Sequence, residues 1–281
     1  MNAAAIAVGR FFRYGNFAIG VALSGLVVLT ALVSFVWTPH SAIDIEIVDK
    51  FKPMSATHWF GTDHFGRDVL SLIMVGARNS IAVGIIAVSA SVTLGTALGL
   101  FASARRGWVE EIVMRLSDLA FAFPAVLTAI MITALWGPSV INAILAIAIF
   151  NVPVFARVTR GAANAVWARE YILAARAAGK GGLRITVEHV LPNILNVLIV
   201  QATIQFALAV LAEAALSYLG LGAQPPLPSW GRMLRDAQSY LYTAPEQAIY
   251  PGIAIAIAVL GLNLLGDGLR DAFDPKLARK R

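Results

Sequence analysis

The stretch RVTRGAANAVWAREYILAARAAGKGGLRITVEHVLPN, residues 157–193, is the longest polar interval in the second half of the chain. It separates two apolar runs, so it must lie outside whatever environment buries them. Good helix formers fill residues 164–178, Gly179 ends them, and Pro192 suits the first turn of the next helix. The stretch therefore predicts a helix-turn-helix with a small-residue flank that another backbone can approach closely. Composition alone leaves open a solvated loop without a partner.

The composition places the apolar runs in a membrane. Hydrophobic residues make up 58% of the 281 residues and charged residues only 14%, whereas a soluble domain carries about a quarter charged residues. The chain has no cysteine, which excludes disulfides and thiolate metal sites. The net charge of +6 could indicate nucleic acid, but the placement of the basic residues explains it without any nucleic-acid partner.

Six stretches are apolar enough to cross a lipid bilayer, whose core of about 30 Å takes about 20 residues per helix. An uncharged run at residues 119–156 is too long for one crossing, and Gly137-Pro138 divides it into two. The other four are residues 16–37, 79–104, 192–212 and 247–266. Backbone in lipid must be hydrogen-bonded within helices. We therefore expect an all-α polytopic membrane protein with six transmembrane helices.

The distribution of Lys and Arg predicts the orientation. Sixteen of these residues fall at the two termini, near Arg105 and within residues 157–193, whereas six fall in the segments on the other side. Both termini and residues 157–193 are therefore expected in the cytoplasm. The first span lacks a clear cleavage site, so it is expected to remain as an anchor.

The chain divides into an N-terminal anchor with an external segment, residues 1–78, and a core of five transmembrane helices, residues 79–281. The external segment holds four residues that could bind a metal: His58, Asp63, His64 and Asp68. Their spacing matches no established ligand motif, so no metal site is predicted. We expect instead that Thr62 or Asp63 caps a helix, that Asp63 pairs with Arg67, and that an amphipathic helix follows along the membrane.

Few polar residues lie within the spans. Gln201 and Gln205 share one helix face, so they either line a polar path or hydrogen-bond between helices. Asn151 could line the same path or accompany a kink at Pro153. Glu213 is an ionisable group at membrane depth and thus a functional candidate, although helix length places it near the external mouth, where it can stay hydrated.

Small residues are frequent in spans two to four. Gly84, Gly95 and Gly99 recur near one helix flank, which fits either close helix packing or a pore. The last external loop is stiffened by prolines, which indicates that something on the outer surface needs a defined shape. The loop residues with a candidate role in docking are Gln224, Pro225, Pro226 and Trp230, the last as an interfacial anchor.

Several kinds of chemistry are missing from the sequence. The only Gly-Lys pair, Gly179-Lys180, is followed by Gly181, so the chain has no phosphate-binding loop for ATP. Glu188-His189 lacks the second histidine of a zinc protease motif, and no nucleophile elbow is present. We therefore expect no catalytic residues, and too few charges lie within the spans for a proton relay.

Three separated motifs together resemble one family. EYILAARAAG at residues 170–179, followed by HVLPN at 189–193, resembles the EAA loop of bacterial ABC-importer permeases. GTDHFGRDVLS at 61–71 and LGLGAQPPLPSWGRM at 219–233 are similar to the DppC/OppC branch, the second permease of dipeptide, oligopeptide and nickel importers. The resemblance runs from about residue 10 to the C-terminus.

This resemblance implies a type I ABC-importer permease in the bacterial inner membrane. Its implied partners are a DppB-like second permease, two cytoplasmic ATPase subunits that bind ATP and Mg, and an external substrate-binding protein; the permease itself binds no cofactor. The residues implied to couple it to the ATPases are Glu170, Ala174, Ala175, Gly179, Leu191 and Pro192. The family pattern has Glu directly before the two alanines, where this chain has Leu173. The implied substrate is a peptide, with nickel or another small solute as the alternative and an ATP-independent transporter as the remote one.

Overall fold

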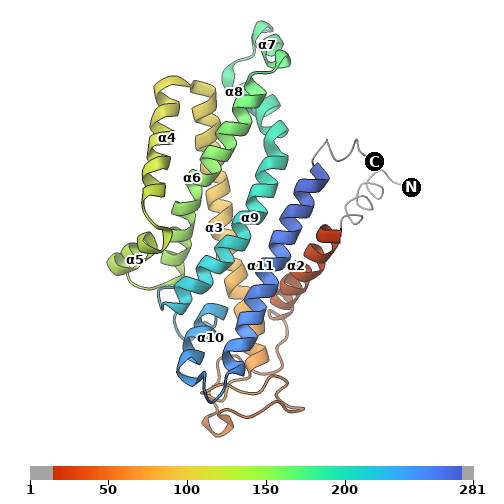
Figure 1. Ribbon diagram of the computed structural model, residues 1–281, viewed down its shortest axis with the longest axis vertical. Helices are drawn as coiled ribbons and strands as arrows, with labels where there is room; N and C mark the ends of the chain where they lie inside the picture. The colour runs from red at the N-terminus through yellow and green to blue at the C-terminus, as the bar shows by residue number, and fades with distance from the viewer. Residues whose placement is uncertain (1–14, 274–281) are drawn as a thin grey trace, which may run out of the picture.

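The computed structural model describes residues 15–273, which form an elongated bundle of helices (Figure 1). The main helices are α2 Gly15–Val33, α3 Val69–Arg105, α4 Gly107–Ala122, α5 Ala125–Trp136, α6 Val140–Trp167, α7 Glu170–Ala177, α8 Gly182–Ile185, α9 Leu191–Tyr218, α10 Trp230–Ala237 and α11 Glu246–Phe273. The short turns are η1 Ile47–Asp49, the π-helical η2 Thr186–Val190 and η3 Gln238–Tyr240. The basic residues before residue 15 and after residue 273, which contribute to the predicted orientation, lie outside the described residues.

Five of the described helices are long and apolar enough to cross a membrane, and a sixth crossing results if the bent pair α4 and α5 counts as one span. The predicted spans other than residues 119–136 each fall on one of these helices: α2, α3, α6, α9 and α11. The all-helical membrane fold is therefore confirmed.

The predicted span at residues 119–136 is wrong in its bounds and its shape. α4 begins well before the uncharged run, and the chain bends by 85° between α4 and α5. Pro124 accounts for the bend because proline lacks an N–H and forces the preceding Phe123 into an extended conformation. The turn predicted after this span is confirmed: Gly137, with φ 83°, ends α5, and the Ser139 side chain caps α6.

α3 is one helix of 37 residues, which corrects the prediction of a separate helix lying along the membrane. Its cap is Asp68 rather than Thr62 or Asp63, and the Asp68 carboxylate accepts a hydrogen bond from the first turn. Arg78, the expected start of the span, lies inside the helix. Its guanidinium carbon is 4.7 Å from the centroid of the Phe35 ring, a cation–π contact that favours a charged group at this place.

Glycines bring α3 into close contact with its neighbours. A methyl group added at Gly95 would lie 2.6 Å from the carbonyl oxygen of Val152, and one added at Gly99 would lie 2.5 Å from that of Ala156, both on α6. A methyl group added at Gly84 would lie 2.6 Å from a ring carbon of Phe206 on α9. These glycines therefore serve helix packing, the first of the two roles that the sequence left open.

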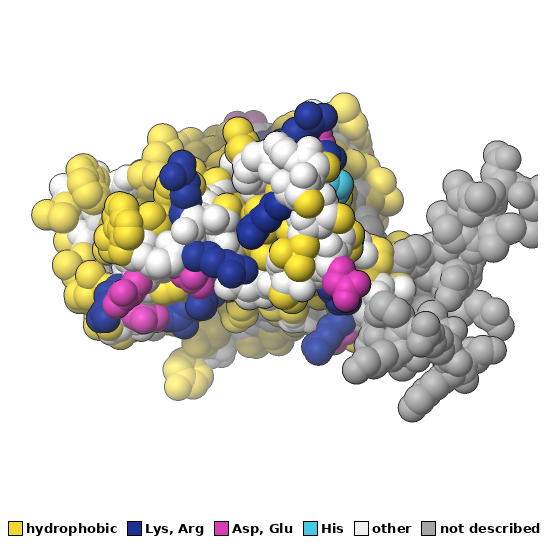
Figure 2. All heavy atoms as spheres, turned by 90° about the horizontal axis from the view of Figure 1, so that it is seen from above, with side chains coloured by type: hydrophobic (Ala, Val, Ile, Leu, Met, Phe, Trp, Pro, Cys, Tyr) yellow, Lys and Arg dark blue, Asp and Glu magenta, His cyan; other side chains and the backbone are white. Residues whose placement is uncertain are grey.

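The two ends of the bundle differ in structure. α7 lies beyond the ends of α6 and α9, whereas α10 and the irregular segment between α2 and α3 lie at the opposite end (Figure 1). The start of α2, the turn between α3 and α4 and the end of α11 point toward the α7 end. Viewed from that end, Lys and Arg side chains are spread over the face (Figure 2). Among the described residues, the basic turn between α3 and α4 and the basic segment around α7 thus lie at one end.

Gly99→Ala is expected to destabilise the bundle, because the added carbon would lie 2.5 Å from the Ala156 oxygen and 2.7 Å from the Cβ of Thr159. Separating α3 from α6 to relieve this overlap costs about 1–3 kcal/mol. Gly161→Ala is the control, since nothing lies within 4 Å of its added carbon. Thermal unfolding in detergent should show a lower midpoint for Gly99→Ala alone. Equal midpoints for the two variants would contradict the close contact.

Candidate functional site

α7 is a short helix that projects from the bundle between α6 and α9 (Figure 1). It ends at Gly179, whose φ of 80° is a left-handed conformation that glycine adopts without strain. The N–H of Gly179 donates to the carbonyl of Arg176 at 2.9 Å, and the N–H of Lys180 donates to that of Ala175 at 3.1 Å. These two bonds close the helix and turn the chain toward α8. The predicted turn at Gly179 is therefore confirmed, but the helix predicted over residues 164–178 is divided, because α6 ends at Trp167 and α7 begins at Glu170.

One side of α7 is held in a buried apolar cluster. Ile172 is fully buried there. The cluster also contains residues of α6, α8, η2 and α9, namely Ala163, Trp167, Ile185, Val190, Ile194 and Leu198. Leu173 and Tyr171, on the two flanks of α7 beside Ile172, are 58% and 45% exposed. α7 is thus fixed to α6 and α9 while it presents apolar and small side chains outward.

An ion-pair group ties the turn after α7 to η2. Glu188 accepts hydrogen bonds from Lys180 Nζ and Arg184 Nε, each at 2.6 Å, and Lys180 Nζ also lies 3.1 Å from His189 Nε2. The bonds from Lys180 and Arg184 lower the pKa of Glu188 to about 2, so this carboxylate stays charged at neutral pH. The spacing of Arg184 and Glu188 is a helical pair visible in the sequence, whereas the part of Lys180 depends on the turn and was missed.

The predicted coupling residues surround α7 in different settings. Glu170 is the exposed first residue of the helix, where a carboxylate faces its positive end. Ala174 is exposed, and Ala175 is partly buried against the cluster. α9 begins at Leu191 with Pro192 in its first turn, as expected. Glu170 and Ala174 therefore face outward, whereas Ala175, Leu191 and Pro192 shape the loop.

A cavity of about 220 Å³ lies between α5, α6 and α9. Its lining is apolar except for Asn151 of α6 and Gln205 of α9, which are 6% and 5% exposed. Two residues predicted to lie on a polar path are thus brought together from separate helices. Gln201, one helical turn from Gln205, is partly buried and does not line this cavity.

The expectation that Glu213 stays hydrated is wrong. Its side chain is 2% exposed and accepts hydrogen bonds from the hydroxyl groups of Ser80 and Ser217, each at 2.7 Å. The Ser217 hydroxyl in turn accepts the N–H of Ala223 at 3.0 Å. Counting residues along α9 could not reveal that α3 and the outer loop cover this position. Glu213 therefore joins these elements to one another and lies away from the cavity.

Trp230 is buried, which corrects its expected position at the membrane interface. The side chain is 1% exposed, and its indole N–H donates to the carbonyl of Ile73 on α3 at 3.0 Å. Gly76 makes room for the ring, because a Cβ there would lie 3.0 Å from Cδ1 of Trp230. The other loop residues expected to dock a partner remain accessible, with Gln224 partly exposed and Pro225 and Pro226 exposed.

The four residues considered as metal ligands, His58, Asp63, His64 and Asp68, do not form one site. His58 Nδ1 lies 3.0 Å from Asp68 Oδ1. Asp63 instead pairs with Arg67 at 2.6 Å, as expected, and lines a separate small pocket with His64. Of these four residues, only His58 and Asp68 are therefore placed to bind the same metal ion.

Comparison with known proteins supports the same architecture. Residues 95–279 match the family described as binding-protein-dependent transport system inner membrane component. The dipeptide transport system permease protein DppC of Alkalihalophilus pseudofirmus is 44% identical over 262 residues, covering 92% of this chain and 86% of that protein. The glutathione transport system permease protein GsiD of Pectobacterium atrosepticum is 42% identical over 259 residues, covering 90% of this chain and 86% of that protein.

A solved structure of the MetNI methionine ABC transporter in inward-facing conformations is also similar. It aligns with a TM-score of 0.61 and 18% identity, covering 72% of this chain and 97% of that chain. At this identity the likeness shows the fold alone.

Glu213→Ala is expected to lower the unfolding midpoint, because it leaves the hydroxyl groups of Ser80 and Ser217 buried without their acceptor. Loss of such a network costs about 2–5 kcal/mol. Glu111→Ala is the control, since its carboxylate pairs with Arg115 on the surface and is 59% exposed. Thermal unfolding of both variants in detergent measures the difference. A midpoint for Glu213→Ala equal to that of the unchanged protein would contradict a structural role.

Proposed function

The chain belongs to the family of binding-protein-dependent transport system inner membrane components, and from this premise we propose that it carries short peptides together with a second permease of the DppB type. It is a multi-pass permease subunit of an ABC importer. The two relatives are named for the transport of dipeptides and glutathione, both short peptides, which supports this substrate class. An importer of the same architecture for nickel or another small solute is the alternative.

The connection between α7 and the cavity is the observation that carries the proposal. α6 contributes Asn151 to the cavity wall and ends at Trp167, in the cluster that holds α7. α9 contributes Gln205 and begins directly after η2, in the same cluster. A force applied to α7 is therefore applied to two helices of the cavity wall. In this proposal, closure of two ATPase subunits moves α7, and the cavity changes the side to which it opens.

The outward face of α7 is proposed to dock an ATPase subunit by shape and apolar contact. Leu173 stands where the family pattern has Glu, and it is 58% exposed beside the exposed Ala174. Burying a leucine side chain in a groove contributes about 1.5–3 kcal/mol. Glu170, one helical turn earlier, keeps a carboxylate near the docking face without taking the place of the missing one.

We place α7 and both termini in the cytoplasm. The spread of Lys and Arg over the α7 end (Figure 2) supports this orientation, because cytoplasmic loops are rich in these residues. The ATPase subunits, with their ATP and Mg, then meet α7. A substrate-binding protein meets the opposite end, where Pro225 and Pro226 are exposed beside Gln224.

Ala174→Glu is expected to uncouple ATP hydrolysis from transport, because it places an unpaired charge on the docking face without touching the buried cluster. Reconstituted with its second permease, ATPase subunits and binding protein, the variant should lose about tenfold or more of its uptake, the effect of 1.4 kcal/mol. Uptake of labelled substrate and ATP hydrolysis in proteoliposomes measure this.

Ala56→Glu is the matched control for this test, since it makes the same change at an exposed alanine of the external segment. It should leave the binding of the ATPase subunits, and the amount of substrate taken up per ATP hydrolysed, unchanged. Normal uptake by Ala174→Glu, with the ATPase subunits still bound, would exclude α7 as the docking site.

The substrate is tested with the same proteoliposomes. They are expected to accumulate a labelled dipeptide in an ATP-dependent manner, and Gln205→Leu should slow this uptake because it removes one of two amides in the cavity. Gln238→Leu, the same substitution at an exposed residue of η3, should have no effect. Accumulation of nickel without accumulation of peptide would favour the alternative substrate.

A further inference from the structure

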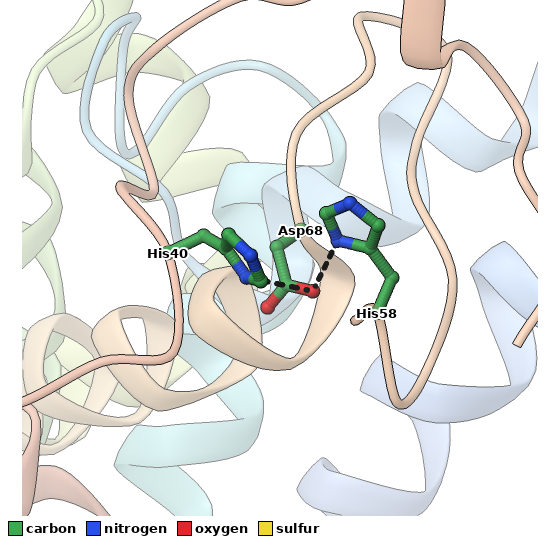
Figure 3. A group of neighbouring side chains, drawn as sticks. All are labelled: His40, His58 and Asp68. Carbon is green, nitrogen blue, oxygen red and sulfur yellow. Dashed lines mark hydrogen bonds and ion pairs between the residues drawn. The ribbon is translucent and has the colours of Figure 1, made fainter. Parts of the chain in front are cut away.

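Two imidazole rings and a carboxylate converge at the start of α3, at the end of the bundle opposite α7 (Figure 3). Asp68 Oδ1 lies 3.0 Å from His58 Nδ1 and 3.6 Å from His40 Nδ1. The two rings lie side by side, with their centroids 4.5 Å apart. One potential ligand atom from each residue lies within 4.8 Å of the other two. His40 and His58, from different parts of the irregular segment between α2 and α3, thus meet Asp68, the N-cap residue of α3.

These separations suit a single transition-metal ion. Metal bonds of about 2.0–2.2 Å to nitrogen and oxygen place two ligand atoms of a tetrahedron about 3.3–3.6 Å apart. The distances of 3.0 Å and 3.6 Å from Asp68 bracket that range, and all three ligand atoms lie within 4.8 Å of one another, so side-chain movements of about 1 Å would complete the geometry. We propose that His40, His58 and Asp68 bind a divalent cation of the zinc class, with water at the remaining position.

The carboxylate is already oriented for this role. Asp68 is 2% exposed, and its Oδ2 accepts the N–H of Ser71 at 2.9 Å and the Ser71 hydroxyl at 2.7 Å. Oδ1 is therefore left facing the two imidazoles. The Ser71 hydroxyl also accepts the backbone N–H of His40 at 3.0 Å, so one serine positions two of the three ligands. Such support from neighbouring groups is what a preorganised metal site requires.

A second carboxylate stands behind His58. Asp49 Oδ2 lies 3.7 Å from His58 Nε2, on the side of the ring away from Asp68. Asp49 is held in place by Lys52, whose Nζ donates a hydrogen bond to Asp49 Oδ1 at 2.5 Å. Histidines that bind a metal through one nitrogen usually direct the other N–H at a carboxylate, which fixes the tautomer. Asp49 is placed to do this for His58.

The ligand types and their exposure define the cation. Imidazole and carboxylate suit Zn²⁺, Co²⁺, Ni²⁺ and Cu²⁺, whereas the chain has no thiolate for softer ions. The His40 side chain is 42% exposed and that of His58 is 13% exposed, so the site opens to water on the His40 side. A bound cation would clip the segment between α2 and α3 to the start of α3, and closing these loops stabilises the external end. This role is independent of the transported substrate.

The test uses the full-length chain in nanodiscs, purified without a histidine tag and stripped with a chelator. Titration with Co²⁺ should give visible d–d absorption bands that saturate at one equivalent, Zn²⁺ should displace the Co²⁺, and Zn²⁺ should raise the unfolding midpoint. His40→Ala should abolish these effects because it removes one of the three ligands. The variant should still fold, because the exposed His40 ring makes no hydrogen bond among the described residues. Asp49→Asn should weaken binding about tenfold or more.

His189→Ala is the matched control, since this histidine lies beside α7 at the other end of the bundle. It should bind Co²⁺ and Zn²⁺ as the unchanged protein does. The unfolding midpoints of all variants without metal show whether each one folds. The proposal is overturned if the unchanged protein gives neither the absorption bands nor the Zn²⁺ shift, or if a folded His40→Ala binds as tightly as the unchanged protein.

Discussion

The arrangement of the whole α7 end of the bundle depends on the burial of Ile172 beneath α7. A helix of 8 residues is not stable alone in water, so its position is set by what it packs against. Ile172 packs into a cluster to which α6, α8, η2 and α9 all contribute. Since α6 and α9 also line the cavity, the place of α7 and the shape of the cavity are physically linked. The outward side chains of α7 are then free to serve a partner.

The two ends of the bundle are stabilised in different ways. At the end opposite α7, Glu213 and Trp230 are buried, and each has a hydrogen-bond partner on α3. Such satisfied buried networks are rigid, because breaking them exposes unpaired polar groups to an apolar surrounding. At the α7 end, Glu188 forms surface ion pairs that contribute little and rearrange readily. This asymmetry favours movement at the α7 end while the opposite end holds its shape.

Local sequence signals predicted most of the fold but not what covers each residue. Long apolar runs and the breakers Gly137 and Gly179 are local, so most of the spans and the end of α7 were predictable, whereas the break between Trp167 and Glu170 was not. The bend at Pro124 was not predicted. α4 contains charged residues and begins before the uncharged run, so the apolar pattern did not mark it as part of a span. The burial of Glu213 and Trp230 depends on packing against α3, which no spacing reveals. His40 was not predicted as a partner of His58 and Asp68 because an irregular segment joins them without any periodic pattern.

The most direct test removes the buried side chain that holds α7 in place and keeps the outward side chains of α7. Ile172→Ala deletes the buried side chain that joins α7 to α6 and α9, whereas Leu173 and Ala174 remain outward. The deciding quantity is the number of substrate molecules taken up per ATP hydrolysed by the complete transporter in proteoliposomes. We expect that the ATPase subunits still bind and hydrolyse ATP while this ratio falls well below that of the unchanged protein. An unchanged ratio would contradict the claim that α7 moves the cavity helices through this cluster.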